Sequence, residues 1–497
     1  MLPLVALVLI TSRAHQETLP NTMPGRRFSE FIEAFNSKDE TRITGLVNHT
    51  FSKLAFKLQS KEDWIAKLLA GSKTYAPVSI QSIPFDNEST IVVKLQGKTN
   101  LPLGIRLDLD PDQPFGIFEA RLGPPDELVA AKKPSRYGDW KDLSTLASEV
   151  QTDSKLPGLC LAYAQLGSAP KIAVTGLRNT LNPNGFIGSD DRVMVGSIGE
   201  AMTATLIARL VDLKKLDWQQ TLSQLLPGMK MQDAYKNITI DQLLHHQSGL
   251  PTNVILSEAD VNQIDSEDDT ATHIRKAYVS RILGEPPVET SVFQAKSSPV
   301  DYSVLGYVAE AHIRQSYEWL MDRFVFQPMK LNTALIAPIG SEDQFGSRNA
   351  IDGHLQSDFG YSPTQFAETK LDWMTAPAGT AISCSIGDLL KFAEFHLKGL
   401  TGDPQILTEA SYQHLHSILG TDPTDKTACG WNVDPAFAGG EPCQSNRGTN
   451  GMYYTEMTIW PKSKTVIVAF TNAGTTKQPA PTRQAILAIR DRLASKE

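Results

Sequence analysis

The spacing of apolar residues predicts that the first part of the chain folds as a small unit of helices followed by strands. Apolar residues recur at helical spacing at Phe28, Phe31, Ile32 and Phe35. A second short helix is predicted over 63–69. Alternating apolar and polar residues then predict four strands: Val78 to Ile83, Thr90 to Leu95, Leu103 to Leu109 and Phe115 to Arg121. We therefore expect an α+β domain over 26–126.

The remaining chain has a different pattern. A stretch with Pro and Lys predicts a linker over 127–139, and residues 140–497 form one long unit without internal repeats. This unit begins with a predicted hairpin of two strands, Leu159 to Gln165 and Lys171 to Thr175. A helix is predicted to begin close to Ser197.

Composition excludes some classes of partner. The chain has 497 residues, of which 41% are hydrophobic and 21% charged, as in ordinary globular proteins. Its formal net charge is −8 without a basic stripe, which argues against nucleic-acid binding. After the N-terminus no run is apolar enough to span a bilayer, so no stable membrane span is expected. No His, Asp or Cys group has zinc spacing, and we predict no cofactor and no metal.

The N-terminus has the features of an export signal. Leu2 to Ile10 is almost wholly apolar, and Ser12-Arg13-Ala14 places small residues where a signal peptidase cleaves. We predict a signal peptide over 1–14 and a secreted or periplasmic protein. The alternative is an apolar segment that is simply buried in the fold.

Four cysteines are too few for a disulfide framework in a chain of this length. Cys429 and Cys443 are close enough in sequence to bridge one loop in an oxidising compartment. Four unpaired and inert thiols are the alternative.

The most informative motif is Gly196-Ser197-Ile198-Gly199-Glu200, which opens the predicted helix after the hairpin. Here the chain resembles class C β-lactamases, D,D-peptidases and β-lactamase-like esterases, which have Gly-Ser-x-x-Lys at a helix start after a strand hairpin. The resemblance continues in order through Ile240 to Pro251, Tyr302 to Tyr307, Ala378 to Phe392 and Gly430 to Asn472.

The resemblance implies a serine β-lactamase or penicillin-binding-protein fold of the α/β (α+β) class. It has an antiparallel sheet flanked by helices, with an all-helical subdomain from about Leu206 to Gln365. The order of elements in 26–126 resembles the cone-shaped nuclear-transport-factor-like fold, which implies a packing or ligand-holding module.

The resemblance implies that Ser197 is the nucleophile and that Tyr302 assists it. In the family a Lys one turn after the Ser, on the same helix face, helps to remove the hydroxyl proton. Here that position is Glu200. The helix dipole lowers the pKa of a carboxylate in the first turn, which makes it a poor base, and its charge disfavours ionisation of Tyr302. We expect impaired acylation, unless burial raises the pKa of Glu200.

Two further positions depart from the family. Val304 stands where the family's Tyr-x-Asn has Asn, and Asn446 aligns best with the Lys or His of Lys/His-x-Gly. A slip of register onto Asn450-Gly451 is the alternative, and neither register restores a cation. Arg447 is expected to point away, because neighbouring strand residues face opposite sides. These changes disfavour substrates that carry a carboxylate.

An oxyanion hole is the feature of the site that we expect to survive. The backbone N–H of Ser197 and a backbone N–H near Gly448-Thr449 would form it. Such a hole, together with binding, can retain roughly 10³-fold catalysis over water.

Each of these residues also has a structural interpretation. Ser197 and Glu200, three apart, can form a capping box, and Tyr302 can be an aromatic that lines the site. For His245-His246 a structural role is favoured over a metal or a base.

Two functions follow. The first is a β-lactamase-related serine hydrolase, impaired by Glu200, that acts on a small ester, amide or peptide-like ligand. The alternative is a non-catalytic binding or scaffold protein of the cell envelope.

Overall fold

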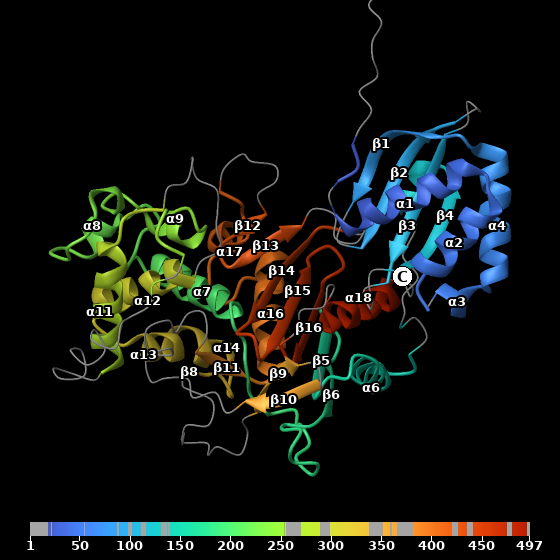
Figure 1. Ribbon diagram of the computed structural model, residues 1–497. Helices are drawn as coiled ribbons and strands as arrows, with labels where there is room; N and C mark the ends of the chain where they lie inside the picture. The colour runs from blue at the N-terminus through green and yellow to red at the C-terminus, as the bar shows by residue number, and fades with distance from the viewer. Residues whose placement is uncertain are drawn as a thin grey trace, which may run out of the picture. The chain divides into compact units, whose positions relative to one another are not determined.

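The computed structural model describes residues 18–20, 22–53, 55–86, 89–97, 102–110, 116–130, 137, 140–252, 254, 270–288, 299–336, 351–357, 360–364, 381–419, 426–434, 441–474 and 480–494 (Figure 1). The chain divides into two compact units, one up to Pro134 and one from Ser135. The predicted signal peptide, 1–14, lies outside the described residues, so export stays a prediction.

The first unit consists of helices followed by an antiparallel meander. Its helices are α1 (Met23–Ser37), α2 (Glu40–Thr50), α3 (Ala55–Leu58), α4 (Lys61–Tyr75) and α5 (Pro125–Ala130). Its strands are β1 (Ser79–Asp86), β2 (Thr90–Gln96), β3 (Leu103–Leu109) and β4 (Ile117–Gly123), in the order β1-β2-β3-β4. Side-chain oxygens of Thr22, Asp39 and Ser60 cap the first turns of α1, α2 and α4, which explains where these helices begin.

The core of the first unit contains the apolar face that the sequence predicts for α1. Phe28, Phe31 and Phe35 are buried there. The predicted linker differs from the structure in its first residues, because α5 continues to Ala130. Leu128 is buried, and its carbonyl oxygen accepts a 2.8 Å hydrogen bond from Nη1 of Arg106 on β3, so this turn belongs to the first unit. The nuclear-transport-factor-like resemblance of this unit stays a prediction.

The second unit contains more elements. Its helices are α6 (Leu143–Asp153), α7 (Ile198–Asp212), α8 (Leu222–Leu225), η1 (Asp233–Tyr235), α9 (Ile240–Leu244), α11 (Ala271–Gly284), α12 (Pro299–Ile313), α13 (Tyr317–Met321), η2 (Asp322–Phe326), α14 (Gln327–Met329), α16 (Ile386–Leu400), α17 (Glu409–Leu415) and α18 (Pro481–Ala494). Its strands are β5 (Gly158–Gln165), β6 (Lys171–Gly176), β7 (Val193–Met194), β8 (Leu335–Ile336), β9 (Gly353–Ser357), β10 (Gly360–Thr364), β11 (Ile382–Cys384), β12 (Thr427–Ala428), β13 (Trp431–Asp434), β14 (Cys443–Thr449), β15 (Tyr454–Trp460) and β16 (Thr465–Thr471).

A seven-stranded antiparallel sheet, in the order β12-β13-β14-β15-β16-β5-β6, organises the second unit. Its central strands are buried on both faces. On β5, Leu159 and Leu161 belong to the core beneath α6 and α18, whereas Cys160 and Ala162 belong to the core shared with α16 and α7. Near-continuous apolar runs such as β5 and β16 are expected where both faces are covered. The predicted sheet flanked by helices is therefore present (Figure 1).

A group of helices that includes α8, α9, α11 and α12 forms the predicted helical subdomain (Figure 1). The predicted end of this subdomain, Gln365, lies outside the described residues. The prediction that it is all helical that far is wrong, because β8, β9 and β10 lie between 335 and 364. These segments are short, and β8 is ordered by pairing with the distant β11, which local sequence does not reveal.

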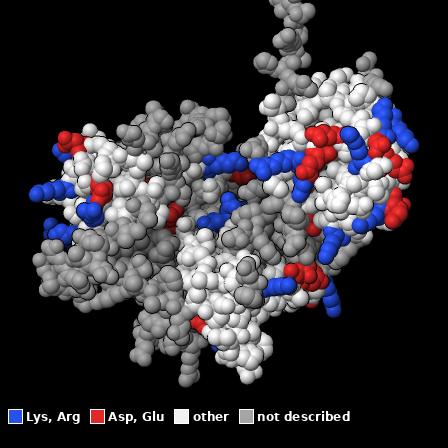
Figure 2. Space-filling view, in the orientation of Figure 1, with Lys and Arg blue, Asp and Glu red and all other residues white. Residues whose placement is uncertain are grey.

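The charged side chains, the helices and the cysteines can be compared with the predictions from the sequence. On the face shown in Figure 2, basic and acidic side chains are interspersed over the described residues. None of the described helices is both long and apolar enough to cross a bilayer. All four cysteines are buried and unpaired, so the alternative of free thiols holds and Cys429 does not bridge to Cys443.

Candidate functional site

The serine predicted as nucleophile lies at the start of α7. Strand β7 leads through Gly196, which has a φ of 56°, into Ser197 and the first turn of the helix. Ser197 is partly exposed, whereas the residues on either side of it are buried. Its side chain makes no capping hydrogen bond, so the capping box considered from the sequence is not formed. The Ser197 hydroxyl is thus not committed to holding the helix end.

The end of β14 packs directly against this helix start. A Cβ added to Gly196 would lie 2.5 Å from the Thr449 nitrogen, and one added to Gly448 would lie 2.8 Å from the Ser197 nitrogen. Only glycine allows two backbones to approach so closely. The two segments predicted to supply the oxyanion hole are therefore brought together.

Asn446, in the position aligned with the family's Lys or His, turns toward the same helix start. Its Nδ2 donates hydrogen bonds to the carbonyl oxygens of Gly430, at 2.6 Å, and Ser197, at 3.2 Å. Asn446 is buried, and its neighbour Arg447 is exposed, as the alternation along a strand requires. Asn446 thus fixes backbone where the family has a cation.

Glu200 is buried in a cluster of acidic and basic side chains. Its Oε2 lies 3.5 Å from Nε2 of His246, and Nδ1 of His246 lies 3.0 Å from Oδ2 of Asp301. Ser248 donates a short hydrogen bond to the other oxygen of Asp301. His246 adopts a left-handed φ of 56°, an uncommon backbone state that is often found at functional sites.

The pKa values of Glu200, His246 and Asp301 follow from their burial and their pairing. Burial raises the pKa of Glu200, and the hydrogen bond and charge of His246 offset this only in part. Burial also raises the pKa of Asp301. For His246 burial lowers the pKa, but hydrogen bonds to Asp301 and Glu200 outweigh it and raise the value to about 10. The expectation that the helix dipole lowers the pKa of Glu200 is therefore wrong, because desolvation dominates over the dipole.

One oxygen in the cluster of Glu200, His246 and Asp301 has no hydrogen-bond partner among the described residues. Oε1 of Glu200 is buried and has no hydrogen-bond partner among the described residues. An unpaired buried oxygen costs about 1–3 kcal/mol, more if it is charged. This oxygen is thus able to accept a proton, including one from a ligand.

Tyr302, predicted to assist Ser197, lies in the same cluster but is committed elsewhere. Its side chain is fully buried, its ring centroid is 5.3 Å from that of His246, and its hydroxyl donates a 2.9 Å hydrogen bond to the Leu244 carbonyl oxygen. Burial raises the pKa of Tyr302 well above 10, and the nearby Cys429, Glu200 and Asp301 raise it further. Val304 is also fully buried on α12, and it offers no polar atom to a ligand.

The sequence missed the part played by His246, Asp301 and Ser248. His246 and Ser248 stand inside the Leu-Leu-His-His-Gln-Ser-Gly segment, and Asp301 directly precedes Tyr302. The available signal was a carboxylate at position 200 in a chain that also has a His-His pair at 245–246. Their pairing links segments more than 50 residues apart, which spacing along the chain does not show.

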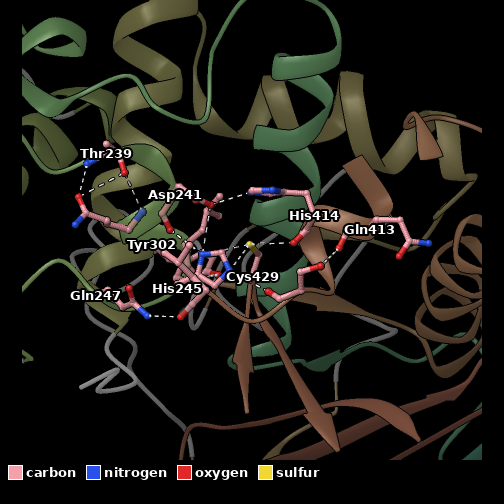
Figure 3. A network of polar contacts seen from close by, with 12 residues as sticks. Thr239, Asp241, His245, Gln247, Tyr302, Gln413, His414 and Cys429 are labelled. Carbon is pink, nitrogen blue, oxygen red and sulfur yellow. Dashed lines mark hydrogen bonds and ion pairs between the residues drawn. The ribbon is translucent and has the colours of Figure 1, made fainter. Parts of the chain in front are cut away.

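A second buried polar cluster lies one residue earlier in two of these segments, before His246 and before Gly430 (Figure 3). It contains Asp241 and His245, one helical turn apart, and Cys429, which precedes Gly430. Oδ1 of Asp241 lies 3.4 Å from Nδ1 of His245, and the Cys429 sulfur lies 3.8 Å from the same nitrogen. His414 donates from Nε2 to Oδ1 of Asp241 at 2.8 Å.

The comparison with protein families agrees with this architecture. The family model described as Beta-lactamase matches residues 147–491. The chain therefore belongs to the beta-lactamase family, whose members include serine hydrolases and penicillin-binding proteins.

Individual relatives and structures are similar at low identity. The chain is 24% identical to Penicillin-binding protein 4 of Amycolatopsis lactamdurans over 335 residues, which are 65% of this chain and 83% of that protein. The octameric penicillin-binding protein homologue from Pyrococcus abyssi superposes with a TM-score of 0.56 at 19% identity, over 71% of this chain and 77% of that one. The D-amino acid amidase from Ochrobactrum anthropi, complexed with L-phenylalanine amide, gives 0.54 at 14% identity, over 71% and 98%. At these identities the superpositions show the fold alone.

Proposed function

We propose that the second unit is a β-lactamase-related serine hydrolase homologue that binds a small amide, ester or peptide-like ligand at Ser197 and acylates this serine only slowly. The observation that carries the proposal is the state of Glu200. At the family's Lys position stands a buried carboxylate that pairs with His246, so no amine is available to take the proton of the Ser197 hydroxyl.

Tyr302 does not compensate for this loss. Its hydroxyl already donates to the Leu244 carbonyl oxygen, and its pKa is raised well above 10, so at neutral pH it stays protonated. General-base assistance is typically worth roughly 10²- to 10⁴-fold in rate. We therefore expect acylation to be slower than in an intact member of the family by a factor of this order.

Binding is better supported than turnover. The backbone of Ser197 and the Gly448-Thr449 segment lie together, as an oxyanion site requires. The site holds Asn446 and Glu200 where the family has cations, so ligands without a carboxylate are favoured. The amidase that shares this fold was crystallised with L-phenylalanine amide and also with L-phenylalanine, which are small ligands of the amino acid kind. The non-catalytic binding protein is the limiting case of this proposal.

One observation favours residual catalysis through Glu200 itself. Burial raises the pKa of this carboxyl group, which makes it a better base than an exposed one, and Oε1 has no hydrogen-bond partner among the described residues. In this second candidate, Oε1 of Glu200 takes the proton of the Ser197 hydroxyl while His246 and Asp301 hold the carboxylate in place.

A mechanism-based probe separates these possibilities. The full chain is treated with a fluorophosphonate or a labelled penicillin, and labelling is followed over time in the unmodified protein and in Ser197→Ala. We expect slow labelling that is lost in Ser197→Ala. Labelling as fast as that of an intact family member would overturn the impairment. Complete absence of labelling would support the non-catalytic binding protein.

A further inference from the structure

The cluster of Asp241, His245 and Cys429 is distinct from the groups that surround Ser197. Asp241 and His245 stand at the start of α9 and directly after its end, and Cys429 lies in the turn between β12 and β13. Their exposed fractions are 4%, 2% and 0%. One ligand atom from each, a carboxylate oxygen, a ring nitrogen and the sulfur, can be chosen so that all three lie within 4.8 Å of one another. The proposed chemistry at Ser197 does not use these groups.

The distances in this cluster match those of ligands around one metal ion. Zn²⁺ binds sulfur at about 2.3 Å and nitrogen or oxygen at about 2.0–2.1 Å in tetrahedral geometry, which puts sulfur and nitrogen about 3.5 Å apart and nitrogen and oxygen about 3.4 Å apart. Nδ1 of His245 lies 3.8 Å from the Cys429 sulfur and 3.4 Å from Oδ1 of Asp241. The backbone oxygen of Asp241, 2.8 Å from the same nitrogen, lies at hydrogen-bond distance and also accepts the N–H of His245, so it is not counted as a ligand.

The groups around the cluster also fit a metal site. A histidine that binds a metal through one ring nitrogen usually donates the other N–H to a carbonyl or a carboxylate, and ligating carboxylates are themselves hydrogen-bonded. Nε2 of His245 lies 3.1 Å from the Ser417 carbonyl oxygen, and Nε2 of His414 lies 2.8 Å from Oδ1 of Asp241. His414 is in turn stacked on Trp218, with ring centroids 4.2 Å apart.

The thiol of Cys429 differs from the other three. Cys160, Cys384 and Cys443 are equally buried, but among the described residues only Cys429 belongs to a group with metal-ligand distances. We propose that Asp241, His245 and Cys429 form a binding site for a divalent cation of the Zn²⁺ class. On binding, the cation replaces the protons on the Cys429 sulfur and on Nδ1 of His245, and these protons pass to solvent.

The site would couple two segments that position the groups around Ser197. His246 directly follows His245 and pairs with Glu200, while Gly430 directly follows Cys429 and accepts the hydrogen bond of Asn446. A cation between His245 and Cys429 would therefore join the end of α9 to the turn before β13. Its role is structural, because all three ligand residues are buried.

Metal analysis of the full chain tests the proposal. The chelator-stripped protein is incubated with Zn²⁺, dialysed and analysed by inductively coupled plasma mass spectrometry. We expect about one Zn²⁺ per chain for the unmodified protein. Cys384→Ser, which removes a buried thiol outside the cluster, and Ser197→Ala should keep this metal. Cys429→Ser and Asp241→Asn should lose it, with folding checked by circular dichroism.

X-ray absorption keeps the test decisive if the variants do not fold. The Zn²⁺-loaded unmodified protein should show a sulfur neighbour at about 2.3 Å and nitrogen or oxygen neighbours at about 2.0–2.2 Å. Failure to retain Zn²⁺ in the unmodified protein, or a metal environment without sulfur, would show that the cluster is held by hydrogen bonds alone and would overturn the proposal. Metal content does not depend on acylation, so this result is independent of the probe experiment at Ser197.

Discussion

At the scale of single residues, the exchange of an amine for a carboxylate at position 200 decides the chemistry. Glu200→Lys should raise the rate of probe labelling at Ser197 by about 10²-fold, because an amine one helical turn from the serine can accept its proton. Glu200→Gln is the matched control, since it removes the charge without supplying an amine and should label no faster than the unmodified protein. A fall in labelling in both variants would identify Glu200 as the working base.

His354 gives a prediction about pH at the same scale. Its buried ring accepts a hydrogen bond from the Thr180 N–H at Nε2, at 3.2 Å, and faces the Asn472 carbonyl oxygen at Nδ1, at 2.9 Å, which fits the neutral form with a proton on Nδ1. Burial lowers its pKa below 6.5. As the pH falls, the unfolded chain therefore binds a proton before the folded chain does. The contribution of the neutral His354 to the free energy of unfolding is fully present above about pH 6.5 and is lost progressively below it.

The measurement is the midpoint of thermal unfolding between pH 7.5 and 5. His354→Gln cannot titrate, and it should flatten the dependence of this midpoint on pH even if its stability is lower at every pH. An unchanged slope in this variant would show that His354 carries no part of the acid sensitivity.

At the scale of elements, the contact between the end of β14 and the start of α7 holds the site together. Gly448→Ala would drive a Cβ into the Val195 carbonyl oxygen. We expect the free energy of unfolding to fall by about 1–3 kcal/mol and labelling at Ser197 to weaken, because overpacking forces the backbones apart. Gly284→Ala, where nothing lies within 4 Å of the added Cβ, is the control and should stay within about 0.5 kcal/mol. Equal effects of the two changes in denaturant titration would contradict this account.

At the scale of the whole molecule, the two units have separate cores. Phe31 belongs to the core of the first unit and Ile467 to one of the second, and both are fully buried. Phe31→Ala should cost about 3–5 kcal/mol, and Ile467→Ala about 2–5 kcal/mol. Each should lower the unfolding temperature of its own unit in differential scanning calorimetry and leave the other transition in place. A single transition that moves in both variants would mean that the units unfold as one.

The sequence by itself determined the features that depend on neighbours along the chain. Helical spacing located the apolar face of α1, strand alternation located the meander of the first unit, and the motif around Ser197 placed the second unit in its family. The same motif located the exchange of Lys for Glu200, and alternation along a strand predicted the direction of Arg447. These features depend on local periodicity or on a short segment, so no knowledge of distant contacts is needed to find them.

Tertiary structure alone decided how the charged groups are paired and buried. The pKa of Glu200 is raised, contrary to the expectation from its helix position, because the fold buries its carboxyl group and the pairing with His246 offsets this only in part. Tyr302 is turned to a carbonyl oxygen on α9, and the Cys429 sulfur meets a histidine 184 residues earlier in the chain. Desolvation and long-range pairing depend on which surfaces the fold brings together, and the order of residues does not carry that information in a local form.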